Sequence, residues 1–402
     1  MVHYVYMKRT IFLLLFLLIA VLGIKTIDYF ALFKPKIIPT TNSGVGQSGD
    51  VLDNKVVSST KQTYHVEKFA EGLEVPWSMV FTDPNRLLIA ERPGRIRVVN
   101  NGVLEPKSLH IFSEVPNKSE EGLMGMALDP DYGSNKFVYV CLAYGDAKKL
   151  ADKIVRFRDR GDRLVEATVI LDAIPAAQYH AGCRIAFGPD KKLYITTGEA
   201  TQKEIAQDIQ SLGGKILRIN NDGSIPSDNP FKNSPVFSYG HRNPQGIAWH
   251  PKSGVLISTE HGPSVFDGPA GGDEINKIEK GKNYGWPLVS HDTNKIGLVA
   301  PLIQFTPAVA PASALIYGGA VFKEWKNQLF FGGLKGEGIY RVMFTNDNAE
   351  KIQSYEKLGI DVGRVREVIE GPDGYIYFST SNRDGRGNPR KGDDMVYRIV
   401  PG

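Results

Sequence analysis

The apolar positions of this chain recur in one local pattern, in which a Pro or Asp-Pro turn precedes a short run of β-branched and aromatic residues. Such turns reverse the chain, and residues of that kind favour strands. Six copies occur, the fifth degenerate: 81–92, 128–140, 187–199, 249–262, 321–333 and 370–381. We therefore expect six repeated units, each with an alternating apolar strand that faces the neighbouring unit.

The spacing of the repeats favours a β-propeller. Sharing residues 64–402 among six units leaves roughly 55 residues each, which suits a four-stranded antiparallel blade with insertions. The sequence thus predicts an all-β, six-bladed β-propeller, with a pair of packed sheets as the alternative. Loops from several blades of a propeller converge on its axis, so functional residues should lie far apart in sequence.

The N-terminal pattern differs from the repeats. An apolar run over 11–24 follows Lys8 and Arg9 and ends at Lys25, as in an export signal. No small-x-small cleavage site follows, so we favour an uncleaved membrane anchor over a cleaved signal. A buried core helix is disfavoured because the run has no amphipathic pattern. We assign 1–35 to this signal or anchor, which predicts an extracytoplasmic protein.

A change of composition separates this run from the repeats. From Thr40 to Thr63 the chain is rich in Thr, Ser, Gly, Asn and Val and has no aromatic residue. Such a segment is typical of a tether. We therefore assign 36–63 to a flexible linker and 64–402 to the folded propeller domain.

Composition and charge exclude several classes of protein. The 42 Gly and 24 Pro residues disfavour helix bundles and coiled coils. A net charge of +4 over 402 residues is too small for a polycationic surface, so we expect no nucleic-acid partner. Only Cys141 and Cys183 are present, which excludes a metal site built from several thiolates. Whether these two cysteines pair stays open at this stage.

Polar residues gather in the loops between the predicted strands. If these loops converge, Arg242, Lys335, Arg364 and Arg366 would place cations from three blades around one pocket, which suits a ligand with several carboxylates or phosphates. The nearby Gly-Pro and Asp-Glu sequences offer the oxygen ligands that calcium prefers. Taken singly, each loop is more typical of a solvated turn. The chain has no P-loop, dinucleotide-binding glycine motif or G-x-S-x-G elbow.

Taken together, the motifs carry a specific resemblance. The matching stretches follow in order through the whole folded part: G-L-E-V-P-W-S-M-V-F (72–81), E-E-G-L-M-G-M-A-L-D-P-D-Y (120–132), H-A-G-C-R-I-A-F-G-P-D (180–190), L-G-G-K-I-L-R-I-N-N-D-G-S-I-P-S-D-N-P-F (212–231), Y-G-H-R-N-P-Q-G (239–246), E-H-G-P (260–263) and G-G-D-E-I-N-K-I-E-K-G-K-N-Y-G-W-P (271–287). The chain resembles the soluble PQQ-dependent glucose/aldose sugar dehydrogenases, which form the glucose/sorbosone dehydrogenase family of six-bladed propellers.

The resemblance implies a role for each matching residue. His180 matches the general base that takes the proton of the anomeric hydroxyl, and Arg242 matches the arginine beside the reacting quinone carbonyls. Further matches concern PQQ and calcium. The implied PQQ contacts are Glu120, Arg242, Asn243, Lys335, Arg364 and Arg366, and the implied calcium ligands are the Gly262 and Pro263 carbonyls and, at a further site, Glu274 and the Tyr284 carbonyl.

Three positions depart from the family pattern. Glu120 stands where a glutamine is usual, and a carboxylate there would repel an anionic quinone unless protonated or paired. Tyr179 replaces a smaller polar residue beside His180, which would alter the sugar pocket. Cys183 replaces a small Gly or Ser, and we expect it to be a buried small apolar residue.

The resulting functional hypothesis is PQQ- and calcium-dependent oxidation of an aldose at C1 to the lactone, with electrons passed on to an external acceptor. The expected partners are the sugar, the acceptor and, through the N-terminal segment, the membrane; the protein would be a monomer or homodimer. Two alternatives remain. One is a calcium-dependent propeller lactonase, and the other is a non-catalytic, membrane-tethered binding propeller.

Overall fold

The computed structural model describes residues 63–116, 119–146, 149–291, 293 and 295–402, in which the strands form six antiparallel sheets. The signal or anchor expected over 1–35 lies outside the described residues, as does the linker except for Thr63. No helix in the described part of the chain is long and apolar enough to cross a bilayer.

Each sheet is one blade, and the strands of each blade are given in order from the innermost to the outermost. Blade 1 contains β2 (Pro76–Asp83), β3 (Arg86–Glu91) and β4 (Arg95–Asn100), with β5 (Val103–Leu104) and β6 (His110–Ile111) both paired to β4. Blade 2 contains β7 (Leu123–Leu128), β8 (Phe137–Asp146), β9 (Lys149–Asp159) and β10 (Leu164–Pro175). Blade 3 contains β11 (Ile185–Phe187), β12 (Leu193–Thr197), β13 (Lys215–Ile219) and β14 (Val236–Tyr239).

The second half of the ring repeats this arrangement. Blade 4 contains β15 (Pro244–Trp249), β16 (Leu256–Glu260), β17 (Asp273–Ile278) and β18 (Ile303–Phe305). Blade 5 contains β19 (Pro311–Ile316), β20 (Leu329–Gly333), β21 (Ile339–Phe344) and β22 (Ile352–Lys357). Blade 6 contains β23 (Val365–Glu370), β24 (Ile376–Thr380), β25 (Val396–Pro401) and β1 (Tyr64–Ala70). The described helices are single short turns: α2 (Tyr132–Asn135) and two 3-10 helices, Lys203–Ala206 and Lys323–Trp325.

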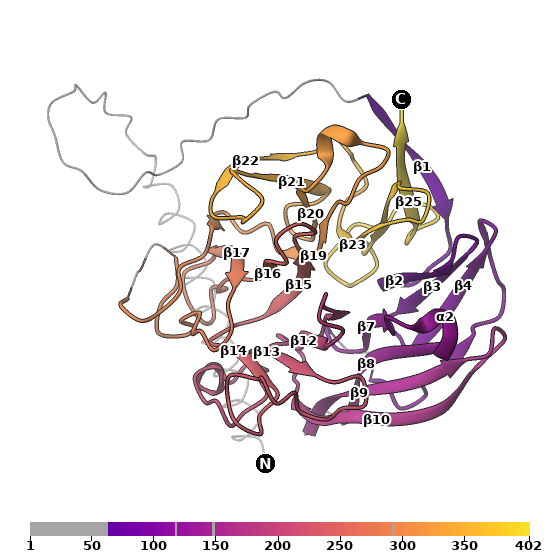
Figure 1. Cartoon of the computed structure of the whole chain (residues 1–402). Helices are drawn as coiled ribbons and strands as arrows, with labels where there is room; N and C mark the ends of the chain where they lie inside the picture. Colours follow the sequence, from indigo (N-terminus) through magenta and orange to yellow (C-terminus); the bar gives the residue numbers. More distant parts are fainter. Residues whose placement is uncertain (1–62, 117–118, 147–148, 292, 294) are drawn as a thin grey trace, which may run out of the picture. The chain divides into compact units, whose positions relative to one another are not determined.

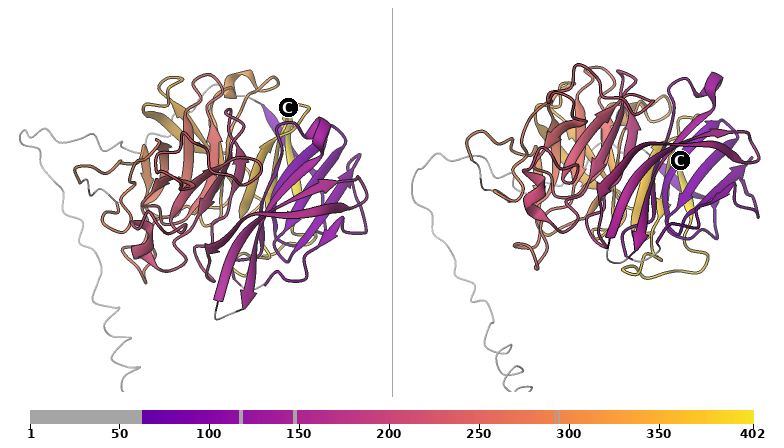
Figure 2. Two further views of the ribbon diagram at one scale, coloured as in Figure 1. Left: turned by 60° about the horizontal axis from the view of Figure 1, so that its bottom comes forward. Right: turned by 90° about the horizontal axis from the view of Figure 1, so that it is seen from below.

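The innermost strands form a closed ring. Each of β2, β7, β11, β15, β19 and β23 contacts the next, and β23 contacts β2 (Figure 1). In the side views the long strands of blade 2 reach past the ends of the neighbouring blades (Figure 2). The predicted six-bladed propeller is confirmed, and the alternative of two packed sheets is excluded.

The six sequence repeats coincide with one structural feature of every blade. Each repeat spans the connection from the innermost strand to the second strand, for example from β11 to β12 and from β23 to β24. The expected alternation of apolar and polar residues is wrong for the second strands: β12, β16, β20 and β24 are buried at every position. Adjacent blades cover both faces of these strands, so neither face needs polar residues.

Apolar packing is distributed over the blade interfaces. Six buried clusters are present among the described residues, and each lies between two adjacent blades. The cluster between blades 2 and 3, for example, joins Tyr139 and Ile154 to Leu193 and Leu217. Stability therefore depends on every neighbouring pair of blades being held together.

Ring closure depends on the two ends of the domain. Strand β1 pairs antiparallel with β25 in a register that runs from Tyr64 opposite Pro401 to Ala70 opposite Val396. Tyr64 and Val66 also pack against the apolar cluster of blades 5 and 6. The first strand of the domain thus completes its last blade.

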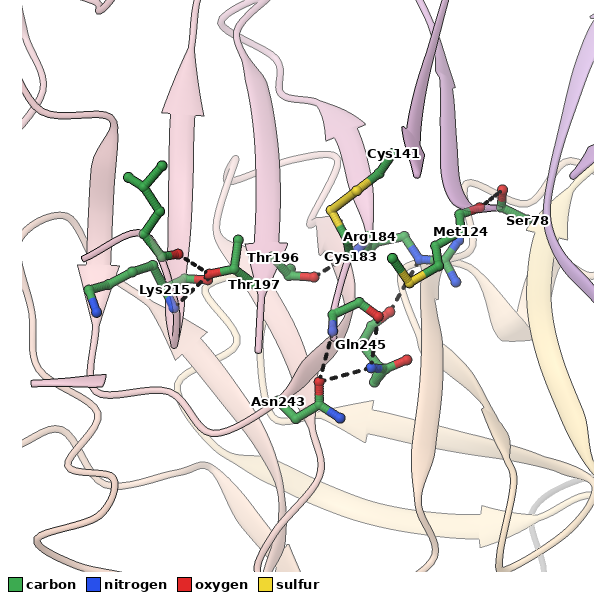
Figure 3. The surroundings of a disulfide bond; sticks show 12 residues. Ser78, Met124, Cys141, Cys183, Arg184, Thr196, Thr197, Lys215, Asn243 and Gln245 are labelled. Atoms are coloured by element: carbon green, nitrogen blue, oxygen red, sulfur yellow. Dashed lines mark hydrogen bonds between the residues drawn. A yellow bond between two sulfur atoms is a disulfide. The ribbon is translucent and has the colours of Figure 1, made fainter. Parts of the chain in front are cut away.

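A disulfide joins blades 2 and 3. Cys141 on β8 bonds to Cys183, which precedes β11, with their Cα atoms 6.3 Å apart (Figure 3). Both residues are fully buried, so the expected burial of Cys183 is confirmed, but Cys183 is a covalent link as well as a small packed residue. Asp152 is buried beside the two sulfurs, and this burial raises the pKa of its carboxyl well above the ordinary value.

Deleting residues 1–70 removes β1 and should destabilise the whole ring. We expect the free energy of unfolding to fall by at least about 3 kcal/mol, because several partly buried side chains and the β1–β25 hydrogen bonds are lost. Urea unfolding of this variant, compared with a variant that lacks only residues 1–62, measures the effect. Equal stability of the two variants would show that β1 does not close the ring.

The double variant Cys141→Ala/Cys183→Ala should be less stable than the wild type. The two cysteines are 42 residues apart, and closing a loop of this length in the unfolded chain is worth about 4 kcal/mol in the chain-entropy model. Thermal unfolding under non-reducing conditions measures the loss. A midpoint unchanged from the wild type would contradict the expectation.

Candidate functional site

One end of the ring carries the predicted site residues. Most of them lie in two kinds of connection, those that enter the innermost strands and those that leave the second strands, which meet at the same end because the two strands are antiparallel. Arg366 and Glu274 instead lie within β23 and β17, and Tyr284 lies in the connection from β17 to β18. His180, Arg242 and Arg364 precede β11, β15 and β23, whereas Gly262 and Lys335 follow β16 and β20. Residues separated by more than a hundred positions therefore share one site.

His180 is held by a buried carboxylate. Only 5% of its surface is exposed, and its Nδ1 lies 2.7 Å from Oε1 of Glu199, the residue two positions after β12. A carboxylate accepts hydrogen bonds, so Nδ1 carries the hydrogen of this contact, and in that tautomer the lone pair of the ring lies on Nε2. The ring of Phe266 is nearly parallel to the imidazole, with ring centroids 6.0 Å apart.

Arg242 lies directly against His180. Its Nη2 is 2.8 Å from His180 Nε2 and 2.8 Å from Asp267 Oδ2, and its backbone N–H donates to Glu260. The oxygen and nitrogen atoms of His180, Glu199 and Asp267 lie close enough together for a metal ion. The guanidinium of Arg242 already supplies positive charge between His180 and Asp267, which disfavours a cation at that place.

Asn243 and Gln245 connect the His180 loop to Arg366. Asn243 Oδ1 accepts from Gly182 N at 3.2 Å and from Gln245 Nε2 at 3.1 Å (Figure 3). Gln245 Oε1 accepts from Arg366 Nη1 at 2.9 Å. The Nδ2 of Asn243 is buried and has no hydrogen-bond partner in the described part of the chain, so a donor is available for a ligand.

The three predicted carboxylate-binding cations differ in their surroundings. Arg366 is buried over the Trp77 ring, 5.4 Å from its centroid, and burial lowers its pKa to about 9. Its Nε has no partner among the described residues. Arg364, in contrast, is paired with Asp384 through Nε at 3.0 Å and Nη2 at 2.7 Å. Lys335 is exposed on the loop after β20. Arg366 is thus the buried cation whose charge is least compensated of the three.

Glu120 is paired, which resolves the conflict expected at this position. Its Oε1 accepts from Arg386 Nη1 at 2.6 Å and its Oε2 from His180 N at 3.0 Å. Burial raises the pKa of Glu120, but the adjacent Arg386 more than offsets this and holds the pKa below its ordinary value. The Glu120 carboxylate is therefore ionised, and Arg386 balances its negative charge. Its bond to His180 N fixes the start of the His180 loop.

Two of the predicted calcium ligands meet the loop before β17. Gly262 donates its N–H to Asp273 Oδ1 at 2.8 Å, and the Pro263 carbonyl accepts from Gly271 N at 3.2 Å. A Cβ at position 262 would lie 2.3 Å from the carbonyl oxygens of Gly271 and Gly272. Only glycine permits this approach of backbone oxygens, which are ligands that suit calcium.

Glu274 and Tyr284 lie around Glu260. Burial and the Glu260 carboxylate raise the pKa of Glu274 to about 8, and Asn276 Nδ2 donates to both carboxylates, at 3.0 Å and 3.4 Å. The Tyr284 ring stacks on His241, which contacts Glu260 at 2.9 Å. A buried carboxylate, Glu260, and a half-buried one, Glu274, close together are an electrostatic environment that favours a cation.

Several site residues were missed by sequence reasoning. Glu199 had a signal, since it stands at the end of the third repeat, on the connection that leaves a second strand. Asp267, Asp384 and Arg386 lie in irregular loops where no periodicity marks them. His261 lies in the E-H-G-P motif at 260–263, but the motif implied no role for it. Burial lowers the pKa of His261 to about 3, so it stands in the site as a neutral imidazole.

The fold and site together define a six-bladed propeller with a buried histidine–arginine pair and further arginines at one end of its ring. The sequence model of the Glucose / Sorbosone dehydrogenase family matches residues 73–391, and the chain belongs to this family. The resemblance drawn from the motifs is thereby confirmed, and membership supports a sugar dehydrogenase, an oxidoreductase, as the class of activity.

Individual relatives agree with this assignment. The aldose sugar dehydrogenase YliI of Escherichia coli is 32% identical, over 80% of this chain and 91% of that protein. Quinoprotein glucose dehydrogenase B of Acinetobacter calcoaceticus is 27% identical, over 85% of this chain and 90% of that protein. The PQQ-bound aldose sugar dehydrogenase of Streptomyces coelicolor is 33% identical, with a TM-score of 0.74 over 85% of this chain and 99% of that chain.

Replacing Arg366 by methionine should stabilise the protein in the absence of ligand. A buried guanidinium without a carboxylate partner costs free energy, and an apolar side chain of similar length removes that cost, so we expect a gain of about 1 kcal/mol or more. Urea unfolding of Arg366→Met measures it, and the exposed Lys191→Met serves as the control. A clear loss of stability in Arg366→Met would mean that the charge is compensated in the folded protein.

Proposed function

We propose that the protein is a PQQ- and calcium-dependent aldose dehydrogenase that oxidises its sugar at C1 to the lactone and passes the electrons to an external acceptor. The observation that carries the proposal is the buried His180–Glu199 pair, which presents Nε2 next to Arg242 and close to unpartnered buried donors. When bound, PQQ supplies the quinone that accepts the hydride.

The donors of the site fit such a cofactor. PQQ is planar and carries three carboxylates as well as quinone carbonyls, so it needs many donors and a local excess of positive charge. Arg366 Nε and Asn243 Nδ2 are buried donors without a partner in the described residues. Because Asp384 already shares the charge of Arg364, we propose Arg366 as the stronger carboxylate partner and Arg364 and Lys335 as weaker ones.

His180 would act as the general base. Glu199 holds its Nδ1 proton and stabilises the imidazolium that forms when Nε2 takes the proton of the anomeric hydroxyl. In the structure Arg242 Nη2 donates to this lone pair at 2.8 Å. An acceptor oxygen of a bound ligand would draw the guanidinium away and free Nε2, while Asp267 keeps Arg242 in the site.

Exposed aromatic side chains beside His180 support a sugar as the substrate. Phe266 is 66% exposed and Tyr179 is 41% exposed, and their ring centroids are 6.4 Å apart. Aromatic faces pack against the apolar C–H groups of a sugar ring. We propose that these rings line the aldose pocket, which gives the unusual Tyr179 a place in substrate binding.

Calcium would occupy the oxygen-rich region formed by the two ends of the connection from β16 to β17. The Gly262 and Pro263 carbonyls are proposed as ligands of the ion beside the cofactor, where it would act as a Lewis acid. Glu274 and the Tyr284 carbonyl are proposed for a further ion. The carboxylates of Glu260 and Glu274, both bound by the side-chain amide of Asn276, support a cation there.

We also propose an extracytoplasmic location, with residues 1–35 as the signal or membrane anchor and 36–63 as the linker. The buried Cys141–Cys183 bond supports this location, since structural disulfides persist in oxidising compartments.

Reconstitution tests the function. Purified protein is incubated with PQQ and Ca²⁺, and dye reduction is followed with a panel of aldoses; we expect sugar-dependent reduction that requires PQQ and is lost after chelation. Hydrolysis of lactones without PQQ would indicate the lactonase instead. An absence of any turnover, with no change in quinone absorbance when sugar is added, would leave the binding propeller.

The variant His180→Ala should lose turnover while it retains PQQ. Removal of a general base lowers kcat by about 10²–10⁴-fold, and the arginines that hold the carboxylates are unchanged. Steady-state kinetics and a PQQ titration separate the two effects, with the exposed His65→Ala as the matched control. Loss of PQQ binding in His180→Ala would mean that His180 has a structural role.

A further inference from the structure

Arg92 is an arginine of the site to which neither the motifs nor the mechanism assign a role. It follows β3, on one of the connections that leave a second strand, so it lies at the same end of the ring as His180 and Arg366. Its residue surface is only 9% exposed. Its side chain makes no hydrogen bond or ion pair with the described residues, and its Nε is buried without a partner.

The main chain around Arg92 is held firmly in place. Arg92 N donates to Val75 O at 3.0 Å, and Leu123 N donates to Arg92 O at 2.9 Å. A Cβ at Gly122 would lie 2.4 Å from Arg92 Cγ and 2.3 Å from Arg92 O. The start of blade 2 therefore packs directly against the stem of Arg92, and a glycine is required for this approach.

The charges near Arg92 leave positive charge uncompensated. Asp384, Glu121 and Glu120 lie within electrostatic range of Arg92, but Asp384 is bonded to Arg364 and Glu120 to Arg386. Arg92 also lies near enough to Arg366 to lower the pKa of Arg366. Four arginines thus lie near these three acidic residues, and burial lowers the pKa of Arg92.

We propose that Arg92, together with Arg366, binds a carboxylate of the cofactor. Carboxylates match the planar fork of a guanidinium, and a buried fork without a partner is arranged to receive one. An acidic sugar could offer the same group, but the aromatic rings proposed for the sugar are exposed, whereas Arg92, Arg366 and Asn243 are all buried. The depth of Arg92 therefore favours the cofactor. This inference rests on the proposed function.

The test is a titration of the ligand-free protein with PQQ, followed by tryptophan fluorescence or calorimetry. Replacing Arg92 by glutamine should raise the Kd at least about tenfold, since one charge-assisted interaction is lost. Arg97→Gln is the matched control, because Arg97 lies on the adjacent strand and pairs with Glu91; its Kd should stay within about twofold. Arg92→Lys should give an intermediate Kd, because it keeps the charge but lacks the fork.

A second readout excludes misfolding as the cause. The melting temperature of ligand-free Arg92→Gln should equal or exceed that of the wild type, because a buried, unpaired cation is removed. If Arg92→Gln binds PQQ with the same Kd as the wild type, the inference is overturned and the proposed function still stands. A wild type that does not bind PQQ would overturn both.

Kinetics with neutral and acidic sugars distinguish the source of the carboxylate. With saturating PQQ, Arg92→Gln should raise KM for glucose and for glucuronate by the same factor or leave both unchanged. A selective rise in KM for glucuronate, with an unchanged Kd for PQQ, would assign Arg92 to an acidic sugar and overturn its assignment to the cofactor.

Discussion

Pairing of β1 with β25 is the interaction on which the rest of the structure depends. A blade buries its apolar faces only against its two neighbours, and the six apolar clusters lie one at each interface. An open row of blades would expose two of these faces to water, so closure stabilises all six interfaces. The closing strand comes from the beginning of the domain and the blade that it completes comes from the end. The Cys141–Cys183 bond adds a covalent link across one further interface.

The closed ring also makes the site possible. Rigid inner strands bring together loops from every blade, and these loops hold side chains that would be unfavourable elsewhere: the uncompensated guanidinium of Arg366, the unpartnered Asn243 Nδ2 and the neutral His261. Each costs free energy in the ligand-free protein, and a polyanionic ligand rich in acceptor atoms would recover that cost. The acids of the site act mainly on other protein groups. Glu199 orients His180, Asp267 retains Arg242, and Asp384 neutralises Arg364.

Much of the fold and of the candidate site could be predicted from the sequence, because repeats and motifs are local patterns. The six turn-and-strand repeats predicted the fold, since each marks the same connection of a blade. Short motifs singled out His180 and Arg242, which the structure places in contact. Partner assignments were harder to predict. Glu120 was predicted to repel the cofactor unless it is protonated or paired, and its partner Arg386 lies far away in sequence. Arg92 escaped notice because nothing local distinguishes a buried, unpaired arginine from one at the surface.

The amino-acid sequence alone was sufficient for the number of blades, the family and the kinds of side chain available for chemistry, because turns, β-propensity and motifs depend on neighbouring residues. Only the tertiary structure decided which charges are compensated, whether the two cysteines are bonded and which strand closes the ring. Burial, the strength of an ion pair and the pairing of chain ends depend on groups that are distant in sequence, so their energies exist only once the blades have come together.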